Sequence, residues 1–180
     1  MIKMKSLKII LGFLFLPLIL ISCDSVEPKD SKTLDKYGSD TDYVIYSVVL
    51  DSVKLLDKKL VLMDSTQFES TVSFNNNYYK TNLPEAEDET FNNYISRNQT
   101  NVKLEKIEGV NSVYYSEVEN PFQNGTIVSL SKVGYNENKT QAILTIGITY
   151  APLAGYGSLF LLKFENGKWK VVGSIMTWIS

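Results

Sequence analysis

The sequence predicts an α+β fold, with N-terminal helices packed on one face of a C-terminal antiparallel meander sheet. Three observations favour this fold class. Apolar residues in segment 43–58 recur at the spacing of an amphipathic helix. From residue 101 onward, apolar and polar residues alternate over several segments. Asn166-Gly167, between two of those segments, is a typical two-residue hairpin turn. Helices first and strands afterwards are the order expected of an α+β domain.

Three helices are expected in the first half of the chain. The first covers residues 43–58, and a short buried strand at 60–63 follows it. The second covers residues 67–79, after capping residues at 64–66. The third begins at Pro84, because proline is favoured at the first helical position. Its inner face is expected to carry Phe91, Tyr94 and Ile95.

Strands are expected in the second half of the chain, around residues 102–104 and 113–115 and over residues 126–133, 141–150, 158–165 and 168–179. The hairpin turn fixes the register of the last two strands. On one face it pairs Phe164 with Trp169, Leu162 with Val171 and Phe160 with Gly173; on the other it pairs Glu165 with Lys168 and Lys163 with Lys170. The aromatic pair and the Glu–Lys pair favour this register, and the Lys–Lys pair opposes it.

Length and composition indicate one folded domain. The chain has 180 residues, of which 44% are hydrophobic, enough for a substantial core. It contains no His and a single Cys, which excludes His-based acid–base catalysis, Ser-His-Asp and Cys-His nucleophiles and Cys/His metal sites. We therefore expect no catalytic residue, no cofactor and no metal.

The first 22 residues have the pattern of a secretion signal. Lys3, Lys5 and Lys8 precede a 13-residue apolar run at 9–21. A membrane-spanning helix needs about 20 apolar residues, so this run is too short to span a bilayer. It matches the apolar region of a signal peptide. The alternative, a buried core helix, does not explain the lysines before the run or the polar segment after it.

Leu20-Ile21-Ser22-Cys23 resembles the lipobox of bacterial lipoproteins. The resemblance covers only the first 23 residues. It implies that a diacylglyceryl group is attached to the Cys23 thiol, that the chain is cut before Cys23, and that the new amine is acylated. Two or more acyl chains, palmitate for example, would hold the protein at a membrane stably. Asp24 resembles an inner-membrane retention signal, whereas acidic residues after the cysteine accompany surface export in other lineages. The inner and outer membranes, and a periplasmic or surface-facing side, therefore stay open.

The predicted organisation is a signal peptide at 1–22, a flexible tether at 23–39 and a single α+β domain at 40–180. From Cys23 onward, 15 basic residues stand against 20 acidic ones, a net charge of −5. Such a domain lacks the basic surface that nucleic acids require, so we expect no nucleic-acid partner. The last strand, with its Gly-Lys-Trp-Lys-Val-Val motif, and the element order resemble nuclear-transport-factor-two-like domains. That resemblance implies a cone-shaped fold and carries no site residue.

Two motifs suggest chemistry, and each has a simpler interpretation. Ser129-Leu130-Ser131-Lys132 matches the S-x-x-K pattern of penicillin-binding enzymes. Its Ser and Lys meet only on a helix, however, and this segment alternates like a strand. The acidic run 85–89 is able to bind a cation, but carboxylates in a first helical turn also stabilise the helix dipole.

The most promising binding residues lie in the loop expected at 151–157. Gly155, Tyr156 and Gly157 form a Gly-aromatic-Gly sequence between two long strands. Such a loop is able to present Tyr156 to a partner while its glycines allow close approach. The alternative is a wide hairpin turn in which both glycines adopt a positive φ.

The sequence therefore predicts a lipid-anchored protein of the cell envelope, whose domain is a non-catalytic binding or structural module. The expected partners are the membrane, through the N-terminal lipid, and an envelope protein or glycan. Two alternatives use a pocket between helices and sheet. One is an envelope hydrolase with carboxylates and tyrosines in that pocket, and the other is a carrier of a small ligand.

Overall fold

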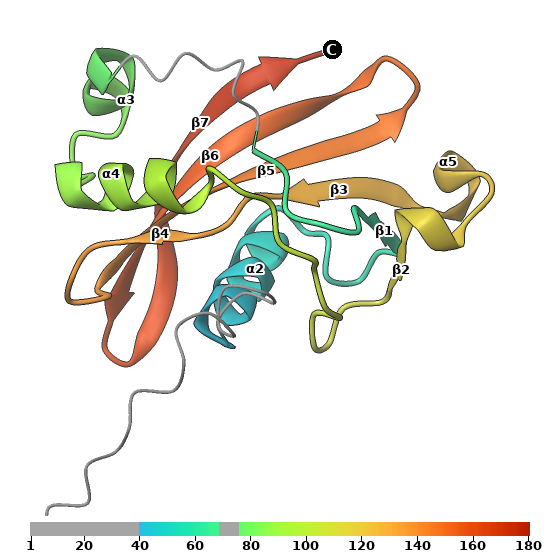
Figure 1. The fold of residues 1–180 in the computed structure, drawn as a ribbon, viewed down its shortest axis with the longest axis horizontal. Helices are drawn as coiled ribbons and strands as arrows, with labels where there is room; N and C mark the ends of the chain where they lie inside the picture. The colour runs from blue at the N-terminus through green and yellow to red at the C-terminus, as the bar shows by residue number, and fades with distance from the viewer. Residues whose placement is uncertain (1–39, 69–75) are drawn as a thin grey trace, which may run out of the picture.

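The computed structural model describes residues 40–68 and 76–180, which form a mixed α/β structure around a large, mostly antiparallel sheet (Figure 1). The signal peptide at 1–22, Cys23 and the tether at 23–39 lie outside the described residues. The elements in chain order are α2 (Asp40–Ser52), β1 (Leu60–Leu62), α3 (Asn76–Asn82), α4 (Asp88–Arg97), β2 (Ser112–Tyr114), the 3-10 turn η1 (Tyr115–Glu117), α5 (Pro121–Asn124), β3 (Thr126–Leu130), β4 (Gly134–Tyr135), β5 (Gln141–Ala151), β6 (Ala154–Glu165) and β7 (Lys168–Ile179).

The sheet has seven strands, ordered β2-β1-β3-β5-β6-β7, with β4 paired to one end of β5. Strands β3, β5, β6 and β7 form the predicted antiparallel meander. Strand β1 instead runs parallel to both of its neighbours. Parallel strands need long connections, and the chain from β1 to β2 and β3 includes α3 and α4. The alternation of residues along the chain did not predict this parallel part.

The hairpin between β6 and β7 is confirmed. Asn166 and Gly167 both have a positive φ, 52° and 77°, as a type I′ turn requires. Phe164 pairs with Trp169 as predicted, with ring centroids 5.3 Å apart. The predicted pairing of Phe160 with Gly173 is wrong.

A bulge in β7 causes that shift. Leu162 still pairs with Val171, but Gly173 pairs with Leu161 and Phe160 with Ser174. Val172 is the extra residue, so the pairs from Leu161–Gly173 to Ser158–Met176 are displaced by one position. A second irregularity between Gly157 and Ser158 displaces Gly157–Trp178 and Tyr156–Ile179 by one position more.

The first helix is confirmed in type but ends at Ser52, earlier than the predicted residue 58. Lys54 adopts a left-handed φ of 60°, and the Leu55 amide donates to the Leu50 carbonyl over 2.9 Å. This is the hydrogen-bond pattern of a Schellman cap, in which glycine is the usual left-handed residue. Lysine gives no such signal in the sequence, and for this reason the end of the helix was predicted too late.

The other two helices differ from the prediction at their starts. Gln67 and Phe68 are not helical, residues 69–75 lie outside the described part, and α3 begins at Asn76. The third helix begins at Asp88 and not at Pro84. Phe91 and Tyr94 face the core as predicted.

Two predicted strands also differ. Residues 102–104 form no strand and make one isolated bridge between Ser65 and Lys103. Strand β3 ends at Leu130, and β6 begins at Ala154, four residues before the predicted start.

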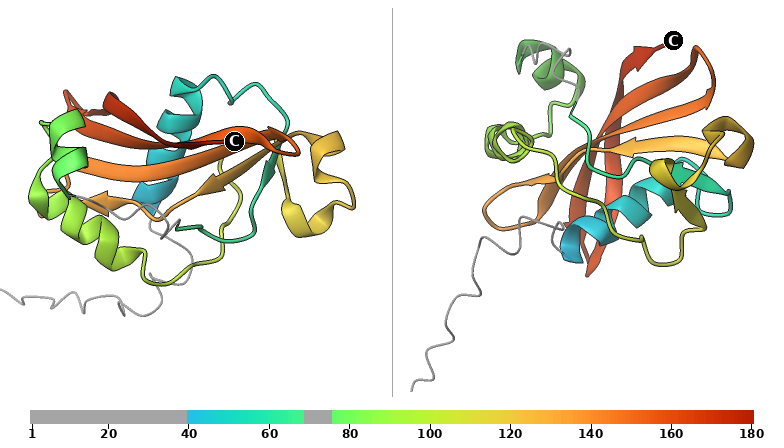
Figure 2. Two further views of the ribbon diagram at one scale, coloured as in Figure 1. Left: turned by 90° about the horizontal axis from the view of Figure 1, so that it is seen from above. Right: turned by 45° about the vertical axis from the view of Figure 1, so that its right-hand side comes forward.

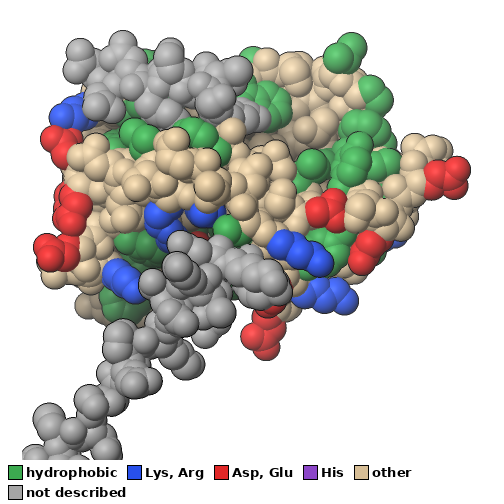
Figure 3. Space-filling model, in the orientation of Figure 1, with side chains coloured by type: hydrophobic (Ala, Val, Ile, Leu, Met, Phe, Trp, Pro, Cys, Tyr) green, Lys and Arg blue, Asp and Glu red, His purple; other side chains and the backbone are tan. Residues whose placement is uncertain are grey.

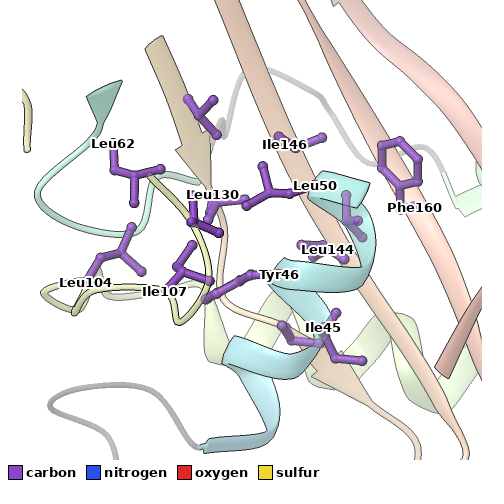
Figure 4. Close-up of a cluster of buried hydrophobic side chains, with 14 of the residues drawn as sticks. Ile45, Tyr46, Leu50, Leu62, Leu104, Ile107, Leu130, Leu144, Ile146 and Phe160 are labelled. Carbon is purple, nitrogen blue, oxygen red and sulfur yellow. The ribbon is translucent and has the colours of Figure 1, made fainter. Parts of the chain in front are cut away.

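The helices pack on both faces of the sheet, so the expectation that they share one face is wrong (Figure 2). One face of β5 and β6 packs with α2 and with the irregular segment that carries Leu104 and Ile107 (Figure 4). The opposite face packs with the α3–α4 segment through Ile143, Leu159 and Leu161. Strands β5 and β6 are apolar on both sides, so each side needs a cover.

Candidate functional site

The predicted Gly155-Tyr156-Gly157 loop is part of strand β6. The turn between β5 and β6 is shorter than expected, and Leu153, with a φ of 61°, is its residue with a left-handed backbone. Gly155 and Gly157 have no positive φ, so the interpretation that both glycines serve a wide turn is wrong. The three residues lie in a sheet, where their side chains alternate between its two faces.

Gly157 belongs to a row of residues that crosses four strands. Ser129 in β3 pairs with Gly147 in β5, Gly147 pairs with Gly157 in β6, and Gly157 pairs with Trp178 in β7. A Cβ added to Gly157 would overlap the Trp178 indole. One added to Gly147 would lie 3.3 Å from the Trp178 Cζ2 atom. It would also overlap the Ser129 side chain, which is its nearest neighbour. Gly157 therefore seats the indole on the sheet, and Gly147 leaves room mainly for Ser129.

Tyr156 lies on the other face, within an apolar surface that we call the turn patch. It consists of Tyr150, Leu153, Tyr156, Met176 and Ile179. Tyr156 pairs with Ile179, and Met176 pairs with Ser158 two residues along the same face. Leu153 is 92% exposed and Ile179 is 74% exposed. Hydrophobic side chains gather at the upper right of Figure 3, where Figure 1 draws the β5–β6 turn and the end of β7.

The turn patch lies in segments that carry no charge. Residues 141–162 and 171–180 contain no Asp, Glu, Lys or Arg. Scattered exposed apolar residues are normal on a protein surface, but a contiguous group of large ones marks an interaction surface. Sequence reasoning identified Tyr156 and missed Met176 and Ile179. The sequence feature that could have identified these two residues is the absence of charge in the C-terminal segment 171–180.

A second apolar surface lies at the opposite end of β6 and β7. A groove of about 590 Å³ separates α2 from the β6–β7 hairpin. We call it the hairpin groove; its lining residues are Thr41, Val44, Val48, Phe164, Gly167, Lys168 and Trp169. Val44 and Phe164 are about half exposed. The sequence did not predict this groove, because α2 and the hairpin are more than 100 residues apart.

The S-x-x-K motif forms no catalytic pair in the structure. The Lys132 ammonium donates to Thr100 Oγ1 over 3.2 Å, and the Ser131 hydroxyl donates to the Lys132 carbonyl over 3.0 Å. Ser129 belongs to the row of small residues beneath Trp178. The space between Trp178, Ser129 and Gln67 has a volume of about 10 Å³, enough for one water molecule.

The carboxylates of residues 85–89 do not converge on one point. Glu85 pairs with Lys163 over 2.6 Å, and this ion pair lowers the pKa of Glu85 below its ordinary value. Glu87 accepts a hydrogen bond from Asn136 over 3.0 Å, and Asp88 pairs with Lys80 over 2.8 Å. Within residues 40–68 and 76–180, no three acidic or Cys side chains are arranged to hold a metal ion.

The most elaborate polar cluster joins α2, α4 and β4. Asp42 is fully buried, and Arg97 reaches both of its carboxylate oxygens, over 3.3 Å and 3.1 Å. The Tyr135 hydroxyl donates to Asp42 Oδ1 over 2.9 Å, and the Arg97 guanidinium lies 5.7 Å from the centre of the Tyr135 ring. Burial raises the pKa of Tyr135 far above its ordinary value, and the nearby Asp42 carboxylate raises it further. This cluster fastens the two helices to β4, and its Tyr135 ring lies 6.1 Å from the ring of Trp169, which lines the hairpin groove.

Comparisons with known proteins returned no match: no protein family, characterised protein or solved structure is significantly similar to this chain. The resemblances to bacterial lipoproteins and to nuclear-transport-factor-two-like domains stay predictions. In the described part of the chain, each helix is too short or too polar to cross a bilayer.

Proposed function

We propose that this protein is a lipid-anchored lipoprotein of the cell envelope, and that its domain is a non-catalytic module that binds another envelope protein through the turn patch. The observation that carries the proposal is the turn patch itself. It exposes four large apolar side chains at one end of the sheet, beside segments that have no charge. Exposure of this kind is unfavourable in water, so a partner that covers it gains binding free energy.

The anchor rests on the sequence. Three lysines, a short apolar run and Leu20-Ile21-Ser22-Cys23 stand in the order of a lipoprotein signal. The 16 residues from Asp24 to the start of α2 reach about 20–24 Å as a flexible coil. The domain would thus stay close to the membrane, whichever of the two membranes that is.

The chemistry of the turn patch favours a protein partner over a glycan. Leu153, Met176 and Ile179 are aliphatic or thioether side chains without hydrogen-bonding groups. Sugars are bound by aromatic rings together with polar groups, whereas protein interfaces have apolar, aromatic and Met-containing centres. Tyr150 and Tyr156 suit either partner, since their rings are apolar and their hydroxyls polar.

The hydrolase alternative has less support. A hydrolase needs at least two ionisable groups that converge in a cleft. The charged side chains buried in the described part are Asp42 and Lys132, and both form hydrogen bonds within the domain. The buried Tyr46 and Tyr135 hydroxyls are also engaged, by the Ser131 carbonyl and by Asp42. The carrier alternative would have to use the hairpin groove, whose apolar walls and volume suit a small ligand.

The anchor is tested by producing the full chain and its Cys23→Ala variant in a bacterial host. Detergent phase partitioning and mass analysis then report lipidation. We expect the natural chain in the detergent phase, with an acylated Cys23 at its N-terminus, and the variant in the aqueous phase. If both chains partition into the aqueous phase, the lipoprotein proposal is wrong.

The turn patch is tested by photo-crosslinking in intact cells. A photoreactive amino acid at Leu153 should give a discrete protein adduct, and the same group at Glu137, exposed in the β4–β5 turn, should not. Adding Met176→Lys to the Leu153 probe should remove the adduct, because a charge would then be buried in the interface. Equal labelling from both positions would show that the turn patch binds no specific partner.

A further inference from the structure

We infer that the hairpin groove docks on the membrane interface and fixes the orientation of the domain, so that the turn patch faces away from the bilayer. The inference rests on the proposed lipid anchor and adds to it a direct contact between the folded domain and lipid.

The walls of the hairpin groove suit the interfacial region of a bilayer. Val44 and Phe164 are half-exposed apolar side chains, and Trp169 lines the groove between them. Tryptophan is enriched where head groups meet acyl chains, because its ring is apolar and its N–H is polar. Lys168 lines the same groove, and a lysine is able to place its ammonium among head groups while its methylenes stay in apolar surroundings.

The point where the tether enters the domain favours membrane contact at the end that carries the hairpin groove. Helix α2 begins at Asp40, and Thr41, the next residue, lines the hairpin groove. The tether therefore joins the domain at the groove. In Figure 1 the start of α2 and the β6–β7 hairpin lie together at the lower left, away from the β5–β6 turn. A lipidated Cys23 keeps the groove within reach of the bilayer, which raises its effective concentration there and makes a weak contact sufficient.

The charge of the hairpin complements anionic lipid. Residues 163–170 contain three lysines and one glutamate, although the mature chain as a whole is acidic. Glu165 pairs with Lys170 over 3.8 Å, Lys163 pairs with Glu85, and Lys168 has no ion pair among the described residues. Basic residues near an anionic membrane surface are attracted to it.

Docking through the hairpin groove would separate the two apolar surfaces. The 12 residues of β6 run from the turn patch to the hairpin, about 40 Å at the usual rise of a strand. With the groove at the bilayer, the turn patch would lie at the far end of the sheet, where an envelope protein has access to it.

The two tryptophans of this chain make a direct test possible, because Trp169 lines the groove and Trp178 lies at the turn-patch end of the sheet, on the opposite face. The acylated full chain is reconstituted as Trp178→Phe, which keeps only Trp169, and as Trp169→Phe, which keeps only Trp178. The vesicles contain phosphatidylethanolamine and phosphatidylglycerol, with and without brominated acyl chains. We expect the brominated lipid to quench Trp169 strongly and Trp178 little, and circular dichroism to show that both variants fold.

A dye gives a second measurement that keeps both tryptophans. Since the only natural cysteine would be blocked by lipid, Val44→Cys and Leu153→Cys each introduce a unique thiol for an environment-sensitive fluorophore. The dye at residue 44 should shift to the blue on vesicles, and the dye at residue 153 should not. On anionic vesicles, Lys168→Glu should weaken both the quenching of Trp169 and the blue shift of the dye at residue 44. It should leave the flotation of the protein with the vesicles unchanged.

The outcomes separate the two proposals. Protein that floats with the vesicles while both tryptophans stay unquenched overturns docking and leaves the anchor intact. Quenching of Trp178 and a blue shift at residue 153 would mean that the turn patch faces the bilayer, which also overturns the inference. Acylated protein that fails to float refutes the anchor, and docking falls with it.

Discussion

Trp178 lies across Gly157, its cross-strand partner in β6, and its indole extends over Gly147 in β5. The absence of a side chain at Gly157 is what lets the ring lie on the sheet. Gly157, chosen from the sequence as a binding residue, therefore supports the last strand, and with it Met176 and Ile179 of the turn patch.

The first prediction concerns Gly157→Ala. The added methyl overlaps the Trp178 indole, and the ring has to move. Overpacking of this kind costs about 1–3 kcal/mol in the free energy of unfolding. Since Gly157 has no positive φ, backbone strain adds nothing to that loss. Urea unfolding, followed by circular dichroism, measures the change.

A double-mutant cycle identifies the cause. In a Trp178→Ala background, Gly157→Ala should cost much less, because the clashing ring is gone. If the alanine costs the same in both backgrounds, Trp178 is not the reason for glycine at position 157.

The meander was predictable because its signals are local. Alternation marks each strand, and Asn166-Gly167 requires a type I′ turn, which fixes the pairs nearest to it. The register was lost at Val172, since nothing in the sequence distinguishes a bulged valine from a paired one. The parallel position of β1 also lacks a local signal, because it depends on the path of the chain through α3 and α4.

The candidate surfaces were predictable only in part. The sequence drew attention to Tyr156, but its neighbours in the turn patch come from another strand that only the hairpin register brings beside it. The ion pair between Asp42 and Arg97 joins residues 55 positions apart and depends on tertiary structure. Long-range pairs of this kind need the fold before they can be recognised.

The second prediction concerns Asp42→Asn, which removes the buried charge that faces Arg97 and Tyr135. Breaking a buried pair leaves the partner charge uncompensated and costs about 3 kcal/mol. The control is Asp88→Asn in the exposed pair with Lys80, where the loss should stay below about 1 kcal/mol. Equal losses for the two variants in urea unfolding would contradict a structural role for the buried cluster.

The third prediction concerns stability in alkaline solution. Burial, together with the neighbouring Tyr94 and Tyr78, raises the pKa of Tyr79 from 10.0 to about 12. Between these pH values the unfolded chain loses this proton and the folded chain keeps it, so stability falls as the pH rises. The contribution of Tyr79 is fully present below pH 10 and is lost toward pH 12.

Tyr79→Phe tests this contribution. The difference in unfolding free energy between the natural chain and the variant should be constant from pH 7 to pH 9. Above pH 10 it should change in favour of the variant, by up to about 3 kcal/mol near pH 12. If the difference in unfolding free energy between the two chains stays constant up to pH 12, Tyr79 ionises equally in the folded and unfolded chains.

The fourth prediction concerns Gln141, whose buried amide fixes the start of α4. Its Oε1 atom accepts from the Glu87 amide over 2.7 Å and from the Thr90 hydroxyl over 2.9 Å, and its Nε2 atom donates to the Glu85 carbonyl over 3.0 Å. Gln141→Leu keeps the approximate volume and removes all three bonds. Leaving such buried groups without partners costs about 1–3 kcal/mol.

Hydrogen exchange locates the effect of that change. The amide of Glu87 should exchange faster in Gln141→Leu, because its acceptor has gone. Gln99→Leu is the control, since Gln99 is exposed and its side-chain amide donates to the nearby Ile95 carbonyl. Faster exchange confined to the first turn of α4 would show that β5 sets where the helix begins. Unchanged protection at Glu87 would mean that the helix start is set by its own residues, as the sequence had suggested for Pro84.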